Sequence, residues 1–461
     1  MATGKRSAGG PGWRRLQTIG LCAVALVAVP LPARAHGVGG LSNLPAPLSF
    51  FLAGVATVLI VSFAQLTLRW PNPRWQVEAP IRPIKVPGWR WMVSGLRGFG
   101  IAGLIVVVAS GVFGVPNSIR NPGPVLVWVG FWLVLPIAGA FLGDLYRLLN
   151  PWRTLAALFG PDSIESSPAS GSVGGWPATV MFLGFVWFEL IYPNPDHPRH
   201  LAVAVICYTV LLLGISERLG PRAAIGRWDA FATYNRLISA IAPLDLDPDR
   251  GPGWRGWLRG LPMVPESPAV AAFVVAILGG VAFHGMSSSA WYETAFGEFG
   301  ASRAGSTVML LSTVGVVATA FLLVCGYAAR QAAGTQSAFR LATGFSHILV
   351  PIAFAFVVAH YFTAVAFEGQ LLLSTISDPF GLGWNLFGTA RRSVDFTWLS
   401  HNQIWWIQVV TIVAGHLAAL TLVHDRSLRD FDGRGGVRAR YSFLLLVILF
   451  AAGGLTILAT G

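Results

Sequence analysis

Six side chains of the sequence could bind a divalent metal ion, namely His36, His360, Glu368, Asp378, His401 and His416. Imidazole and carboxylate groups are the usual ligands of zinc, and imidazole also binds copper. A metal ion with one open position lowers the pKa of a bound water molecule and polarises a phosphoryl oxygen, which favours ester hydrolysis. No HExxH-type spacing is present, so this metal prediction depends on the abundance of these residue types.

His36 is a separate candidate because it follows a cleavage pattern. Residues 1–35 begin with basic residues, continue with the apolar run IGLCAVALVAV and end with Ala-Arg-Ala. This order is typical of a secretory signal peptide. Cleavage would make His36 the first mature residue, where its free amine and its imidazole could chelate copper together. We therefore predict a signal peptide at 1–35 and a single transmembrane helical domain at 36–461.

The composition places these residues in a membrane protein. Hydrophobic residues make up 54% of the 461 residues, charged residues make up 11%, and the mean hydropathy is +0.62. A soluble domain would carry about twice that charged fraction. The net charge of +12 follows alternate loops instead of clustering on one face, so we predict no nucleic-acid partner.

The apolar residues fall into ten stretches, which predict an all-α, polytopic bundle of about ten transmembrane helices in a lipid bilayer. They span about 47–68, 96–115, 124–143, 176–192, 201–216, 267–284, 306–326, 345–367, 403–424 and 441–460. With the mature N-terminus outside, the inner loops hold 22 Lys and Arg residues and the outer loops hold 5. This distribution follows the positive-inside rule and predicts that orientation in a bacterial plasma membrane.

Five of the nine histidines lie in or beside the stretches 345–367 and 403–424. An ionisable side chain within a membrane is costly unless it faces a partner, a cavity or a metal, so His360 and His416 are functional candidates. Two stacked haems would need both ligands of one helix on one side, but His347 and His360 differ by roughly 220°. The spacing thus argues against haem. A hydrogen bond to a neighbouring helix is the structural alternative for His360, while Glu189 and His284 end two other stretches on the predicted outer side.

The longest predicted inner loop covers 217–265 and contains the segment GRWDAFATYNRLISAIAPL. Its pattern predicts an amphipathic helix on the membrane surface. A connector whose arginines reach toward the interface is favoured over a regulatory module.

Several short motifs resemble a family of bacterial multi-pass membrane proteins labelled fenitrothion hydrolase. The motifs are HGVGG from His36, NLPAPL from Asn43, NPWR from Asn150, AHYF from Ala359, SDPFG from Ser377 and AGHLAALTLVHDR ending at Arg426. The resemblance implies hydrolysis of an organophosphate triester that releases a nitrophenol. It assigns no nucleophile and no metal ligand to any residue of this chain.

We therefore expect a metal-assisted phosphotriester hydrolase with an outward-facing site of histidines and carboxylates. Zinc or copper would be the cofactor, and a small apolar substrate would reach the site from the bilayer. The first alternative is a transporter or metal-handling permease in which the same histidines line a path. A b-type haem protein or a structural membrane component is the further alternative.

Overall fold

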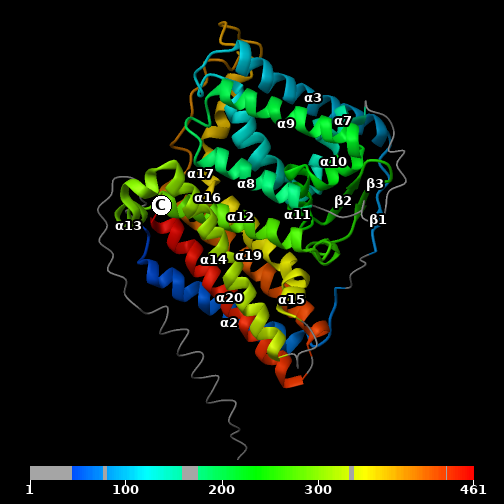
Figure 1. The fold of residues 1–461 in the computed structure, drawn as a ribbon, viewed down its shortest axis with the longest axis vertical. Coiled ribbons are helices and arrows are strands. Elements are labelled where there is room, and N and C mark those ends of the chain that lie inside the picture. Colours follow the sequence, from blue (N-terminus) through cyan, green and yellow to red (C-terminus); the bar gives the residue numbers. More distant parts are fainter. Residues whose placement is uncertain (1–43, 76–79, 158–174, 332–336, 432, 461) are drawn as a thin grey trace, which may run out of the picture.

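The computed structural model describes residues 44–75, 80–157, 175–331, 337–431 and 433–460 (Figure 1). The described residues are 75% helical and contain almost no strand, which confirms the predicted all-α polytopic bundle. The predicted signal peptide and His36 lie outside the described residues.

Nine helical segments in the described ranges are long and apolar enough to cross a membrane. They are Leu48–Arg69 (α2), Trp89–Phe113 (α3), Pro122–Leu142 (α4 Pro122–Pro124, η1 Val125–Val134, α5 Leu135–Leu142), Pro198–Leu219 (α9), Pro268–Ser287 (α12), Arg303–Gln331 (α14), Ala338–His360 (α15 Ala338–Phe345, η5 Ser346–Ile348, α16 Leu349–His360), His401–Asp430 (α19) and Gly435–Thr460 within α20 (Gly433–Thr460). A shorter apolar helix, α8 (Trp176–Leu190), occupies the fourth predicted stretch. The ten apolar stretches of the sequence therefore correspond to these nine segments and α8.

Shorter elements connect the spans. They are α6 (Leu145–Leu149), α7 (Pro151–Ala156), α10 (Pro221–Arg227), α11 (Ala230–Ser239), α13 (Ala290–Ala301), α17 (Phe362–Ala366), α18 (Leu371–Thr375), η4 (Leu261–Met263), η6 (Glu368–Gln370), β1 (Arg82–Pro83), β2 (Leu244–Asp247) and β3 (Gly251–Trp254). The strands form one antiparallel sheet in the order β1-β3-β2. We call the end of the bundle with this sheet the hairpin end, and the end with α13 and residues 361–400 the loop end (Figure 1).

Small residues let the central helices approach closely. An added Cβ at Gly415 of α19 would lie 2.6 Å from the Pro351 carbonyl oxygen of α16. At Gly279 of α12 it would lie 2.6 Å from the Val314 Cα of α14. Close packing around small residues is a main source of helix association in lipid, because apolar side chains gain little by leaving an apolar solvent. These contacts fix the helix ends that carry the histidines.

Helix α11 lies inside the bundle, so the predicted surface location is wrong. Its Tyr234, Leu237 and Ile238 side chains are at most 1% exposed, and it contacts α5, α6, α8 and α16. The N-terminus can be buried because the Asp229 carboxylate accepts hydrogen bonds from the Phe231 and Ala232 backbone N–H groups. The amphipathic pattern was real, but its polar side faces a protein network in place of the lipid headgroups.

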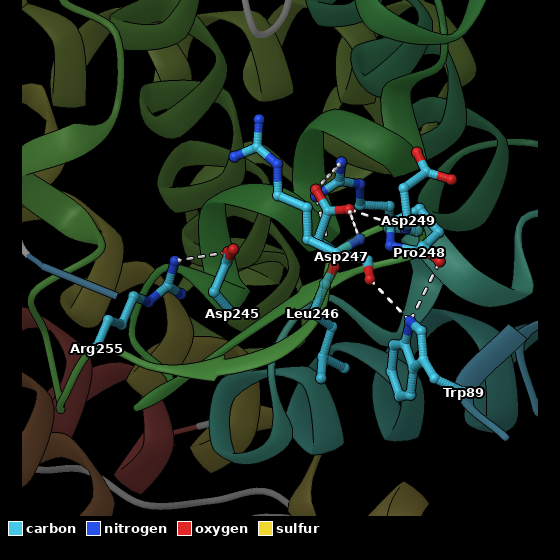
Figure 2. A network of polar contacts seen from close by, with 9 residues as sticks. Trp89, Asp245, Leu246, Asp247, Pro248, Asp249 and Arg255 are labelled. Atoms are coloured by element: carbon cyan, nitrogen blue, oxygen red, sulfur yellow. Dashed lines mark hydrogen bonds and ion pairs between the residues drawn. The ribbon is translucent and has the colours of Figure 1, made fainter. Parts of the chain in front are cut away.

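The sheet at the hairpin end is tied to the start of α3. Figure 2 shows the Trp89 indole N–H donating to the Asp247 and Pro248 carbonyl oxygens, at 2.9 and 3.2 Å. The Arg147 guanidinium pairs with the Asp247 carboxylate at 3.0 Å. Burial raises the pKa of this carboxyl. Hydrogen bonds from the Arg250 and Asp249 backbone N–H groups and the Arg147 charge lower it by a larger amount, so the pKa lies below its usual value. These contacts hold the hairpin in one position beside α6.

Candidate functional site

Three helices end at the same level near the loop end and bring four polar side chains together. Glu189 lies in the last turn of α8, His284 in the last turn of α12, and His360 at the end of α16. Tyr361 follows His360 directly, and all four side chains are partly buried. We call these residues the Glu–Tyr–His cluster.

Two short hydrogen bonds connect the cluster. The Tyr361 hydroxyl donates to Glu189 Oε1 at 2.7 Å and lies 2.9 Å from His284 Nδ1. Because the hydroxyl hydrogen is used for the carboxylate, the Tyr361 oxygen must accept from a protonated Nδ1 of His284. That tautomer leaves His284 Nε2 able to accept a proton.

His360 lies against His284, and within the described residues no hydrogen bond joins the two imidazoles. The two imidazole centroids are 4.5 Å apart with an interplanar angle of 71°, and the Tyr361 ring is 5.0 Å from the His360 ring. Gly285 forms the wall beside His360, since an added Cβ there would lie 3.4 Å from His360 Cε1 and would collide with Ile457. A side chain at position 285 would therefore displace Ile457, while the His360 imidazole lies at ordinary contact distance from that position.

Aromatic side chains extend the cluster toward α11. The Tyr234 ring centroid is 4.8 Å from that of Trp132 and 5.8 Å from that of Phe182, which lies two turns before Glu189 on α8. The buried Tyr234 hydroxyl is within electrostatic range of Glu189, and within the described residues it has no hydrogen-bond partner. Such a hydroxyl can form a hydrogen bond with a water molecule that reaches it, which would extend the series of hydrogen bonds from Glu189.

A carboxyl, a phenol and an imidazole in series can move a proton without moving the backbone. Each group both donates and accepts, so the direction of the hydrogen bonds can reverse along the chain. In membrane proteins, chains of Glu and His side chains in bundle interiors are typical proton relays. The arrangement is therefore suited to proton transfer between His284 and Glu189.

Of the six predicted metal-binding residues, the five that lie in the described ranges do not meet as a group of three or more ligands. Glu368 lies at the protein surface on η6. Partial burial of its carboxyl and the nearby Asp196 charge raise the pKa of that group. Asp378 closes a loop, because its two carboxylate oxygens accept the Leu382 and Gly383 backbone N–H groups at 2.9 Å. His401 is exposed at the first position of α19.

His416 lies deeper, between α19 and α16. It is fully buried, its Nδ1 is 2.6 Å from the Ile412 carbonyl oxygen, and its ring centroid is 6.0 Å from that of Phe356. Across the ranges that the structure describes, no group of three or more His, Cys, Asp and Glu side chains could hold a metal ion. His360 contacts His284 and Tyr361.

Sequence reasoning identified Glu189, His284 and His360 separately but missed Tyr361 and the bonds that join them. The only local signal was the position of Tyr361 next to His360 in the AHYF motif. No protein-family model, curated protein or solved structure matches this chain.

Proposed function

We propose that this protein is a proton-coupled membrane permease and that the Glu–Tyr–His cluster is its proton relay. The observation that supports this most directly is the chain Glu189–Tyr361–His284, with contacts of 2.7 and 2.9 Å, between three helices of a multi-pass bundle. The predicted outward orientation of the loop end would expose the His284 side of the chain to protons from outside. Organophosphate hydrolysis stays a prediction of the family resemblance.

One proton passes from His284 through Tyr361 to Glu189. A proton binds His284 Nε2, and the Nδ1–H proton moves to the Tyr361 oxygen. The original hydroxyl proton of Tyr361 moves to the Glu189 carboxylate. The result is a neutral carboxylic acid, a neutral phenol and a neutral imidazole, so one proton has crossed the cluster.

Neutralising Glu189 gives this transfer a mechanical consequence. A carboxylate within a bundle is stabilised by its hydrogen bonds and destabilised by desolvation, so removing its charge changes the hydrogen bond between the end of α8 and Tyr361 and the preferred position of these two segments. A permease needs such a difference between two packing states to couple proton entry to solute movement. The histidine pair makes a divalent metal ion a reasonable trial solute.

The experiment uses purified protein in proteoliposomes that contain a pH-sensitive dye. Proton flux is measured under an imposed potential, first alone and then with external zinc or cobalt. We expect flux in the native protein and a loss of about 10-fold or more in Tyr361→Phe, since one hydrogen bond of ~1.4 kcal/mol corresponds to that factor. Phenylalanine keeps the ring and removes only the hydroxyl.

Tyr327→Phe is the matched control, because Tyr327 is exposed on α14 and far from the cluster in sequence. Flux in Tyr361→Phe equal to that of the native protein would contradict the relay. The same preparation is assayed for nitrophenol release from a chromogenic phosphotriester. Metal-dependent release without any proton flux would replace the permease with the hydrolase.

A further inference from the structure

A polar cavity of about 290 Å³ lies at the hairpin end, apart from the Glu–Tyr–His cluster. Residues of α6, α7, α10, α11, β2 and η4 line it, so its walls come from segments far apart in the sequence. Helix α11 contributes Thr233 and Arg236 to this cavity while its Tyr234 points to the aromatic residues near Glu189. The cavity and the aromatic residues near Glu189 therefore lie on different sides of α11.

The lining of this cavity is positively charged. It contains four arginines and two aspartates, Arg147, Arg153, Arg236, Arg255, Asp144 and Asp245. At neutral pH these six side chains carry a net charge of +2. A cavity of this kind attracts anions because its low-dielectric walls concentrate the field of the guanidinium groups.

Two of the arginines are already held in place. Arg255 is only 9% exposed, pairs with Asp245 at 3.3 Å and donates to the Ser239 carbonyl oxygen at 2.6 Å (Figure 2). Arg147 pairs with Asp247, which lies outside the cavity lining. Their charges remain in the wall, but their hydrogen-bonding groups are largely used by the protein.

The other two arginines have donors to spare. Among the described residues, the Arg153 and Arg236 side chains make no hydrogen bond or salt bridge, although the Asp144 charge reaches both. Burial lowers the pKa of the Arg153 guanidinium, and the nearby Arg147 charge lowers it further. The positive charges repel one another, and an anion between them would remove that repulsion.

We propose that this cavity binds a phosphate group through Arg153 and Arg236. Each guanidinium offers a planar set of N–H donors that matches two oxygens of a phosphate. The phosphate belongs either to an anionic lipid headgroup or to a small soluble phosphate ester. Both sources would be present at the hairpin end, which the distribution of Lys and Arg predicts to face the cytoplasm.

Ordinary interfacial arginines are the competing explanation, because positive residues gather on the inner side of most membrane proteins. Arg259 represents that class here, since it is exposed at the same end and does not line the cavity. Arg153, which is partly buried, and Arg236, which is exposed, differ from Arg259 because both line the cavity with Asn150 and Thr233. Comparing these two arginines with Arg259 therefore separates cavity binding from a general effect of surface charge.

The test measures ligand binding to the full-length protein in detergent at constant ionic strength. One arm uses inorganic phosphate and glycerol phosphate, and the other uses phosphatidic acid in mixed micelles with phosphatidylcholine micelles as the blank. We expect Arg153→Gln and Arg236→Gln each to weaken binding about 10-fold, as the loss of one charge-assisted contact predicts. Arg259→Gln should bind as the native protein does.

Binding in the soluble arm identifies a soluble phosphate ester, and binding in the lipid arm alone identifies a headgroup. Thermal unfolding of each variant shows that a weaker affinity is not caused by loss of the fold. The proposal is overturned if neither arm shows binding, or if Arg259→Gln weakens binding as much as Arg153→Gln and Arg236→Gln do.

Discussion

Replacing Asp229 should destabilise the protein more than any other single carboxylate change at the hairpin end. The side chain is fully buried at the N-terminus of α11. Its Oδ2 accepts from the Tyr146 hydroxyl at 3.2 Å and from Asn150 Nδ2 at 2.8 Å. Its Oδ1 accepts from the Tyr208 hydroxyl at 2.9 Å and from two backbone N–H groups at 2.9 and 3.1 Å. Asp229 therefore joins α6, α9 and α11.

The size of the effect follows from these contacts. Asp229→Ala leaves five donors without their acceptor, and each buried unpaired group costs about 1–3 kcal/mol unless water enters the space. Loss of the N-terminal cap accounts for about 1 kcal/mol of this. We expect a total of about 5 kcal/mol, the lower limit of this sum, because water can reach part of the space. With an unfolding entropy of about 1 kcal/mol/K for a chain of this length, Tm should fall by roughly 5 °C.

Thermal unfolding of the detergent-solubilised protein measures this change. Asp249→Ala is the matched control, because Asp249 is exposed in the same inner segment and, among the described residues, only its backbone N–H makes a hydrogen bond. Asp229→Asn keeps the shape and one acceptor, so it should fall between the native protein and Asp229→Ala. Asp229→Asn is also the variant to compare with Asp249→Ala if Asp229→Ala does not express. Equal Tm values for Asp229→Ala and Asp249→Ala would refute the reasoning.

Two further predictions use glycines as probes of close packing. Gly454→Ala should destabilise the protein by about 1–3 kcal/mol, because the new Cβ would collide with the Phe356 ring. Gly453→Ala, where nothing lies within 4 Å, should be neutral or stabilising by up to about 1 kcal/mol, and thermal unfolding that failed to separate the two would be inconsistent with this packing. Gly285→Ala should destabilise the protein by about 1–3 kcal/mol, because the new Cβ would collide with Ile457 of α20. A Tm equal to that of the native protein would contradict this close approach of α12 and α20.

Hydropathy predicted the membrane segments because crossing a bilayer requires a long apolar run whatever the neighbouring helices do. The same argument located His360 and His416 within spans, since helix rise converts sequence position into depth. It could not show that His416 bonds to the Ile412 carbonyl of its own helix while His360 faces another helix. That distinction depends on how each helix is rotated against its neighbours.

Sequence patterns also do not show whether the predicted metal-binding side chains meet in space. Glu368, Asp378 and His401 are close to one another in sequence and on the predicted outer side, yet the loop that contains them uses Asp378 to satisfy its own backbone. Residues of a long loop can adopt many arrangements, and local hydrogen bonds select among them. Within the described residues these side chains form no group of three ligands, and metal binding by this chain stays a prediction.

The sequence by itself determined that the chain is a multi-pass membrane protein and that Glu189, His284 and His360 are ionisable groups at span ends. These properties depend on composition and periodicity, which are local. Only the tertiary structure decided that Tyr361 connects Glu189 to His284, and that α11 enters the bundle to form the arginine-lined cavity. Both depend on helices far apart in the sequence meeting at one place, and packing of the whole bundle is what fixes that meeting.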